Sequence, residues 1–362
     1  MNVVVVGGGV IGLAVAWRAQ RAGLTVTVID PAPASKASHV TAGMLPPGNE
    51  QLFDKPELLA LCLRSRELIP SFMAELGEIA PAGYRRDGVL DAAFDEEALD
   101  SLDRQIALQE SVGIPAERLT AEEVAKLQPA FGPVHGGLFS PDEGAVDPRF
   151  LNPALIKAVE SLGGTLVRRR AVRVADHAVV LDNGESVPFD RLVLAAGPWT
   201  HRIEGLPEGA VPEIHPVKGH ILRLTSETPL LGVTARAMSK GTSLYLVPRP
   251  DGELAIGATY EEVGYDESAT ASGAFELLTR ASAAIPGLGA LRFGGISAGF
   301  RPCSPDGLPL IGPSTLPDVY LATGHARMGV QLAAVTAETL TAQLTGTEPH
   351  ASTVPFSPLR LS

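Results

Sequence analysis

Three glycines near the start of the chain have the spacing of a nucleotide-binding turn. Gly7, Gly9 and Gly12 follow an apolar run at residues 3–6 and precede a helical pattern. In such a turn the first glycine permits a tight bend, the second lets the backbone approach a pyrophosphate, and the third lets the helix pack closely on the strand. The N-terminus of the helix then presents free N–H groups and a positive dipole end to the phosphates. The spacing therefore predicts a dinucleotide site.

An acidic residue completes this pattern. A second apolar run at residues 26–29 ends at Asp30, where a carboxylate accepts hydrogen bonds from a ribose 2′-hydroxyl and disfavours a 2′-phosphate. Strand, glycine turn, helix, strand and acid thus follow one another in the order of the dinucleotide-binding fingerprint.

Further motifs occur later in the chain. Residues 194–199 read Leu-Ala-Ala-Gly-Pro-Trp, and residues 299–302 read Gly-Phe-Arg-Pro. Residues 306–312 read Asp-Gly-Leu-Pro-Leu-Ile-Gly, and residues 324–329 read Gly-His-Ala-Arg-Met-Gly. In this order the motifs resemble the D-amino-acid-oxidase family of flavoproteins. In that family the first motif passes under FAD, and the last is a flavin-facing loop that opens the final helix.

The resemblance covers nearly the whole chain, because residues 216–219 and 245–249 are also similar to this family. It implies FAD as the cofactor, bound without a covalent link. Related sarcosine oxidases attach FAD through a cysteine several residues before the Pro-Asp of the motif. Here a glycine stands at that distance, and Cys303 is too close. The residues expected to contact FAD are Gly7, Gly9, Val10, Ile11, Gly12, Asp30, Thr41, Ala42, Gly43, Met44, Val172, Ala196, Gly197, Trp199, Arg301, His325, Arg327, Met328, Gly329 and Val330.

Within the family the chain resembles the glycine oxidase branch, which supplies the imine for the thiazole half of thiamine. The resemblance implies that Arg301 holds the substrate carboxylate with its two-donor guanidinium, and that Tyr245 donates a hydrogen bond to the same carboxylate. It places Arg327 near flavin and substrate, and Met44 near the isoalloxazine ring. The implied reaction is oxidative deamination of glycine, sarcosine and small D-amino acids, by hydride transfer from Cα to flavin N5. It reduces O2 to H2O2, and the imine gives glyoxylate and ammonia or feeds thiazole formation.

This reaction needs alignment rather than a side-chain base if the amine is bound neutral. We therefore expect no catalytic acid or base, and we assign no catalytic role to His325. A helix start at Gly329 should direct backbone N–H groups at the flavin N1 and O2, where negative charge develops. We expect no metal site, because His215 and His220 fall on opposite faces of an extended stretch.

Other functions are compatible with the same fold. A D-amino-acid dehydrogenase that passes electrons to a quinone, or a sarcosine-type demethylating enzyme, would differ only in acceptor or substrate. A flavin-dependent tRNA-modifying enzyme and a non-catalytic FAD-binding protein are further alternatives. An NAD-dependent dehydrogenase fits the first motif alone.

Charge and composition limit the expected partners. The 362 residues carry a formal net charge of −12, which argues against nucleic acid because no basic field is available to displace counterions. Two cysteines cannot form a disulfide framework, and the glycine-rich stretch 3–17 is too short to span a bilayer. The first strand leaves no room for a basic leader, so we expect a cytoplasmic protein. The family suggests a homo-oligomer such as a tetramer.

The order of elements predicts an α/β fold with two discontinuous domains. The FAD-binding domain, Rossmann-like with a parallel sheet and helices, is expected from residues 1–83, 142–212 and 297–362. An α+β substrate domain with a mainly antiparallel sheet is expected from residues 84–141 and 213–296.

Local patterns predict individual elements of this fold. An alternating pattern predicts a strand over 84–94 that carries a glycine in the middle, and Asn183-Gly184 predicts a hairpin. Helical spacing of apolar residues predicts helices over 54–79, 95–112, 151–162, 268–285 and 330–344.

Overall fold

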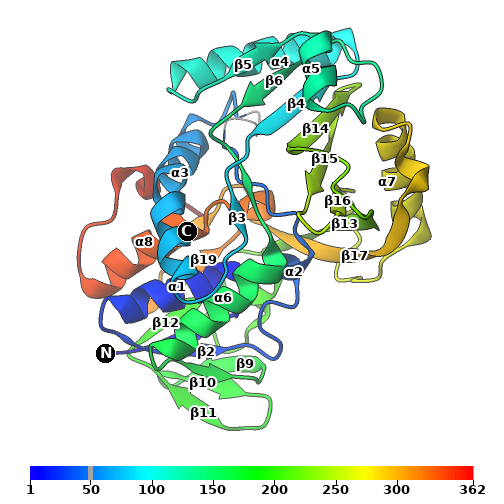
Figure 1. The fold of residues 1–362 in the computed structure, drawn as a ribbon. Coiled ribbons are helices and arrows are strands. Elements are labelled where there is room, and N and C mark those ends of the chain that lie inside the picture. The colour runs from blue at the N-terminus through cyan, green and yellow to red at the C-terminus, as the bar shows by residue number, and fades with distance from the viewer. Residues whose placement is uncertain (48–51, 362) are drawn as a thin grey trace.

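The computed structural model describes residues 1–47 and 52–361, which fold into two regions that are each built on a sheet (Figure 1). One sheet has six strands in the order β18-β19-β12-β1-β2-β8, and the other has eight in the order β17-β13-β16-β15-β14-β4-β6-β5. The predicted mixed α/β fold is confirmed.

The six-stranded sheet is parallel except for its edge strand β18, which runs antiparallel to β19. Helices cover one face, and a three-stranded sheet covers the other (Figure 1). The strands of the six-stranded sheet are β1 (Asn2–Val6), β2 (Thr25–Ile29), β8 (Thr165–Val167), β12 (Arg191–Leu194), β18 (Leu310–Pro313) and β19 (Val319–Thr323). The covering elements are α1 (Val10–Arg21), α3 (Pro56–Gly77), α6 (Pro148–Ser161) and α8 (Ala333–Thr345) on the helical face, and β9 (Ala171–Ala175), β10 (Ala178–Leu181) and β11 (Ser186–Pro188) on the other.

The side chains of β1 alternate between these two layers. Val3 and Val5 are fully buried in the core with α1, α3, α6 and α8, whereas Val4 and Val6 are buried in the core beneath the three-stranded sheet. A run of four valines is therefore apolar throughout because both faces of a parallel sheet are covered. The predicted hairpin at Asn183-Gly184 joins β10 to β11 and is confirmed.

Two glycines allow α1 to begin directly against this sheet. Gly7 has a φ of +111°, and a side chain on it would collide with the backbone of Ala195, at the end of the neighbouring strand β12. A side chain on Gly12 would collide with the carbonyl oxygen of Gly7. The helix, the turn and two parallel strands therefore pack at backbone distance.

The eight-stranded sheet is antiparallel apart from the parallel pair β4–β14. Its strands lie in the segments predicted for the substrate domain, except that β17 crosses the predicted boundary at residue 297. The strands are β4 (Val89–Ala93), β5 (Glu117–Leu119), β6 (Gly136–Ser140), β13 (His215–Thr225), β14 (Thr234–Ser239), β15 (Thr242–Pro248), β16 (Glu253–Gly257) and β17 (Arg292–Cys303).

The helices of this region are α4 (Glu96–Ser111), α5 (Ala121–Leu127) and α7 (Ala271–Ala284). Short helical turns occur in both regions: α2 (Ala37–Val40), η2 (Gly197–Arg202), η3 (Leu288–Ala290), η4 (Ala326–Met328), η5 (Ala351–Phe356) and η6 (Pro358–Leu361).

Two predicted elements are wrong in detail. The strand expected over 84–94 is two strands in different sheets: β3 (Tyr84–Arg85) pairs with β7 (Ala145–Val146), and β4 joins the large sheet. The break falls at Gly88, whose φ of +88° no extended strand adopts. The last helix begins at Ala333 rather than at residue 330, because the chain first makes the tighter turn η4.

Within residues 1–47 and 52–361, the helices that form are all too short or too polar to cross a membrane.

The contact at Gly12 generates a stability prediction. We expect Gly12→Ala to lower the free energy of unfolding by about 1–3 kcal/mol, because the added methyl group must displace either the helix or the turn. Gly77→Ala is the matched control, because nothing lies within 4 Å of the added carbon there. Urea denaturation of both variants checks this, and equal stability of the two would contradict the assigned contact.

Candidate functional site

A cavity of about 1250 Å³ extends from the turn after β1 to the eight-stranded sheet. Its lining includes every residue predicted to contact cofactor or substrate except Gly12. Gly12 instead packs against the Gly7 carbonyl, which is the packing role expected of the third glycine. The structure thus brings into one cavity residues that lie as far apart in the sequence as Gly7 and Val330.

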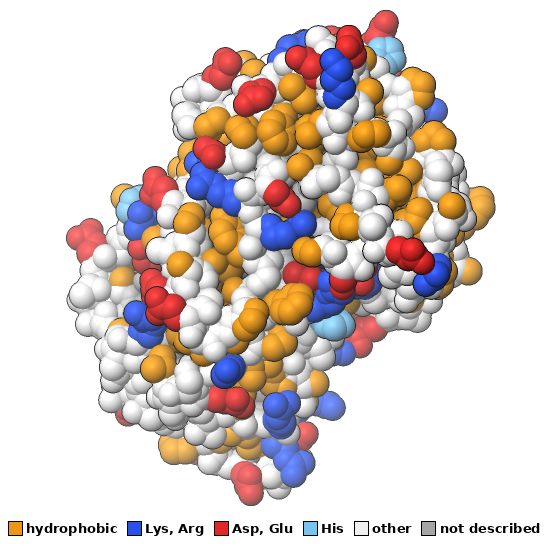
Figure 2. Space-filling model, in the orientation of Figure 1, with side chains coloured by type: hydrophobic (Ala, Val, Ile, Leu, Met, Phe, Trp, Pro, Cys, Tyr) orange, Lys and Arg blue, Asp and Glu red, His pale blue; other side chains and the backbone are white. Residues whose placement is uncertain are grey.

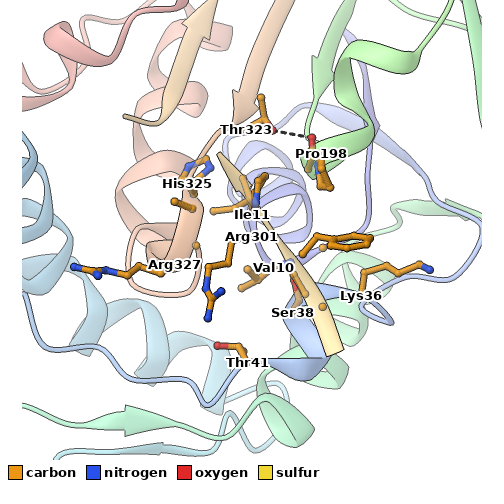
Figure 3. A pocket seen from close by; sticks show the side chains of 18 of the residues that line it. Val10, Ile11, Lys36, Ser38, Thr41, Pro198, Arg301, Thr323, His325 and Arg327 are labelled. Atoms are coloured by element: carbon orange, nitrogen blue, oxygen red, sulfur yellow. Dashed lines mark hydrogen bonds between the residues drawn. The ribbon is translucent and has the colours of Figure 1, made fainter. Parts of the chain in front are cut away.

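The nucleotide end of the cavity lies at the N-terminus of α1. Its N-cap, Gly9, provides no side-chain hydrogen bond, and the first turn carries no acidic residue. The backbone N–H of Val10 donates to Ser38 Oγ at 2.9 Å, and these two side chains lie close to each other in Figure 3. Ser38 was not among the predicted site residues, because it lies on the short helix α2, far from the glycine turn in sequence. The geometry leaves an anion-binding helix terminus facing the cavity.

Asp30 lines the cavity, and its carboxylate is fixed by the backbone. Oδ2 accepts a hydrogen bond from the Gly8 N–H at 2.7 Å, and Oδ1 accepts one from the Ala32 N–H at 2.8 Å. Each oxygen retains lone pairs beyond these bonds. Asp30 can therefore accept further hydrogen bonds from a ribose without moving.

The segment from Thr41 to Met44 forms another wall of the cavity. Gly43 has a φ of +78°, and a side chain there would collide with the Val146 carbonyl. The Val146 N–H donates to the Gly43 carbonyl at 2.8 Å, and Met44 forms an antiparallel bridge with Ala145. This wall is consequently held to strand β7 by backbone contacts.

Arg301 extends into the cavity from β17 (Figure 3). Its Nη1 donates to the Thr259 carbonyl at 3.1 Å. The guanidinium lies over Gly219, where an added Cβ would be 2.5 Å from Nη2. The glycine at position 219 therefore makes room for the cation, which explains why this motif accompanies Arg301.

Tyr245 stands in a row of residues that crosses the large sheet. It pairs with Gly257 on β16 and with Arg236 on β14, and Arg236 pairs with Asp91 on β4. A Cβ on Gly257 would lie 2.5 Å from the Tyr245 ring. Arg236 also lines the cavity and makes a two-donor ion pair with the fully buried Asp91. Sequence reasoning missed this pair, because 145 residues separate its members.

Arg327 lies at the cavity wall but is exposed. In Figure 3 its guanidinium points away from Arg301. Both cations line the same cavity, and the position of Arg327 near flavin and substrate stays a prediction. Helix α8 begins at Ala333, so the predicted helix start at Gly329 is wrong, although Gly329 lines the cavity in a turn just before that helix.

His325 is buried at the cavity wall, and its Nε2 lies 2.9 Å from Thr336 Oγ1. Burial lowers the pKa of His325 to about 3. Its imidazole is therefore neutral at physiological pH.

Charges of both signs are interspersed over the face in Figure 2. Many of them are paired, such as Arg118 with Asp103 at 2.7 Å. The described residues of this face form no continuous basic patch. Among residues 1–47 and 52–361, no group of three or more His, Cys, Asp or Glu side chains is arranged to hold a metal ion.

Comparisons with known proteins agree with this geometry. A model of the DAO family, described as FAD dependent oxidoreductase, matches residues 2–343. The chain belongs to this family.

Its relatives include proteins of known name. The bifunctional protein ThiO/ThiG of Synechocystis sp. is 35% identical over 348 residues, covering 93% of this chain and 50% of that protein. The chain thus spans about half the length of such relatives. The glycine oxidase of Geobacillus kaustophilus is 31% identical over 347 residues, covering 92% of this chain and 90% of the relative. The crystal structure of glycine oxidase from that organism superposes with a TM-score of 0.91 at 29% identity, covering 98% of this chain and 97% of that one.

The family is described as FAD dependent oxidoreductase, and the cavity fits that cofactor. Its nucleotide end offers a helix terminus with a glycine N-cap, which leaves room for a pyrophosphate, and a carboxylate fixed by backbone N–H groups. Its other end reaches the Thr41–Met44 wall and Arg301. The groups at the two ends of the cavity therefore fit a nucleotide joined to a ring system.

The glycine at the nucleotide end can be tested by substitution. We expect Gly9→Val to give a folded but colourless protein, because the side chain would enter the pyrophosphate region, where an added Cβ already lies 3.1 Å from Ser38 Oγ. The visible absorption spectrum of the purified variant, with circular dichroism to establish folding, measures this. A yellow variant with wild-type flavin content would contradict the prediction.

Neutral His325 predicts a pH dependence of stability. Its folded pKa lies below the unfolded value of 6.5, so the unfolded state takes up a proton that the folded state excludes. Its contribution is complete above pH 6.5 and is lost as the pH falls towards 3. Between pH 7 and pH 5 we expect the wild type to lose about 2 kcal/mol more unfolding free energy than His325→Gln. Urea denaturation at both pH values measures this, and parallel losses in the two proteins would refute it.

Proposed function

We propose that this protein is an oxidase of glycine and other small amines, including sarcosine and small D-amino acids. The observation that carries the proposal is the position of Arg301, which enters the cavity that Tyr245 and the Thr41–Met44 wall also line. The glycine oxidases among its relatives support the same substrate class. The expected products are glyoxylate, ammonia and hydrogen peroxide, or an imine that feeds thiazole formation in thiamine biosynthesis.

In this proposal Arg301 binds the substrate carboxylate. Its guanidinium is anchored by the Thr259 carbonyl and backed by Gly219, so two parallel N–H groups can face a carboxylate with little loss of side-chain entropy. Tyr245 donates its hydroxyl to the same carboxylate, with its ring held against Gly257. Two contacts fix the orientation of a two-carbon substrate better than one.

FAD, when bound, accepts the hydride from the substrate Cα at N5 and delivers the electrons to O2. The protein's contribution is orientation and exclusion of water. His325 is neutral at physiological pH and its Nε2 is engaged with Thr336 Oγ1, so we assign it no general-acid role. The substrate amine is expected to enter in its neutral form.

The carboxylate clamp is tested at Arg301. We expect Arg301→Ala to lower kcat/KM for glycine. The loss corresponds to about 2–5 kcal/mol of transition-state stabilisation, because the substrate carboxylate loses its charged partner. Arg301→Lys retains the charge without the two-donor fork, and should recover only part of the loss. Steady-state oxygen uptake measures both variants. Unchanged kinetics in Arg301→Ala would show that the carboxylate binds elsewhere.

The reaction itself is tested by oxygen consumption with glycine, sarcosine, D-alanine and D-proline. We expect uptake with glycine accompanied by peroxide. Flavin bleaching without oxygen uptake would instead favour a dehydrogenase, and bleaching with none of the four would overturn the substrate assignment.

We also propose that the protein is a cytoplasmic homo-oligomer that binds FAD noncovalently. Loss of the yellow colour on acid precipitation tests the noncovalent link, and sedimentation of the holoprotein tests the assembly.

A further inference from the structure

Arg249 is the most deeply buried cation near the flavin-facing wall of the cavity. It follows the last residue of β15, and only 2% of it is exposed. Its Nη2 donates to the Ala42 carbonyl at 2.6 Å, and its Nη1 donates to the Val146 carbonyl at 3.2 Å. One guanidinium therefore joins three segments that are distant in the sequence.

The two carbonyls belong to the pair of segments that form the Thr41–Met44 wall. Gly43 and Met44 contact Val146 and Ala145 through the backbone. The Leu45 N–H donates to the Gly144 carbonyl at 3.1 Å. Arg249, directly after the end of β15, adds side-chain hydrogen bonds to both of these segments.

Burial of Arg249 is costly, and its charge is only partly compensated. The carboxylate of Asp147 lies 3.8 Å from Nε, which makes no hydrogen bond, and Asp147 is itself paired with Arg149 at 2.6 Å. Burial lowers the pKa of Arg249 to about 10, so the group stays charged at neutral pH. An apolar side chain would avoid this cost but could not bind two carbonyls. The burial of this charged group therefore indicates that the two hydrogen bonds of the Arg249 guanidinium have a function.

The same strand carries the proposed substrate ligand. Tyr245 and Arg249 are four residues apart, so an extended chain directs both side chains to the same face of the sheet. Tyr245 would contact the substrate, and Arg249 contacts the wall against which the flavin ring is expected to lie. Strand β15 therefore connects the proposed substrate ligand Tyr245 with the residue that contacts the wall, Arg249.

We propose that Arg249 is a positioning residue that fixes the Thr41–Met44 wall relative to β15, and thereby aligns bound flavin with substrate. The alignment step rests on the proposed amine oxidation, whereas the effect on FAD binding does not. Arg249 itself does not line the cavity, so it acts through Ala42 and Val146.

The test compares Arg249→Lys with Arg85→Lys. Arg85 donates to the Pro248 carbonyl at 2.6 Å, at the end of the same strand, and its side chain forms an ion pair with Asp87 rather than with a residue of the Thr41–Met44 wall. Apoprotein of each variant is titrated with FAD by fluorescence quenching, and the visible spectrum of bound flavin is recorded. Anaerobic flavin reduction by glycine is then followed by stopped-flow absorbance.

For Arg249→Lys we expect the dissociation constant of FAD to rise about tenfold, as for the loss of one buried hydrogen bond. We expect the limiting reduction rate to fall on the order of tenfold to a hundredfold, as for a small misalignment of reacting atoms, with little change in the apparent affinity for glycine. Arg85→Lys should match the wild type in all three measurements.

Wild-type FAD affinity and reduction rate in Arg249→Lys would overturn the inference. Equal losses in the two variants would also overturn it, because general destabilisation of β15 would then explain the effect. If glycine fails to reduce even the wild type, the proposed function fails. FAD affinity and the flavin spectrum still decide whether Arg249 positions the wall.

Discussion

The packing of α1 against the turn after β1, at backbone distance, governs the position of the rest of the nucleotide end. Gly7 lies against the backbone of Ala195, and Gly12 lies against the carbonyl of Gly7. These contacts determine where the helix N-terminus points and how close a phosphate group can approach its N–H groups. The other face of α1 is buried in the core shared with α3, α6 and α8, so a displaced α1 would also displace the last helix and the turn η4 that precedes it.

The opposite end of the cavity depends on buried charge rather than on close backbone packing. Arg301 and Arg249 donate to backbone carbonyls, and Arg236 donates to the carboxylate of Asp91. A guanidinium remains charged at any physiological pH, and its planar donors hold two acceptors in one orientation. Two guanidinium groups, those of Arg301 and Arg236, therefore line this end of the cavity, and Arg249 lies behind it, whereas the nucleotide end is built from backbone amides. The two kinds of anion recognition suit a carboxylate and a pyrophosphate respectively.

The glycine turn, Asp30 and most helices could be predicted from the sequence, because each depends on a pattern within one short continuous segment of the chain. Arg301 could be predicted only through its motif, since the glycine that accommodates its guanidinium lies on another strand. The Asp91–Arg236 pair and the carbonyl contacts of Arg249 could not be predicted, because they depend on strand register between distant segments. The exposure of the Arg327 side chain could not be predicted, because it depends on the turn η4. The prediction of one strand over residues 84–94 did not take account of the backbone freedom of Gly88.

The order of strands in the six-stranded sheet has a consequence for synthesis on the ribosome. Strand β12 lies between β1 and β19, so one of its hydrogen-bonding edges stays open until more than a hundred further residues have been translated. An open edge on an apolar central strand readily pairs with another chain. During translation of the intervening residues the nascent protein therefore carries an unpaired edge on β12, and its folding is exposed to aggregation until β19 has been made.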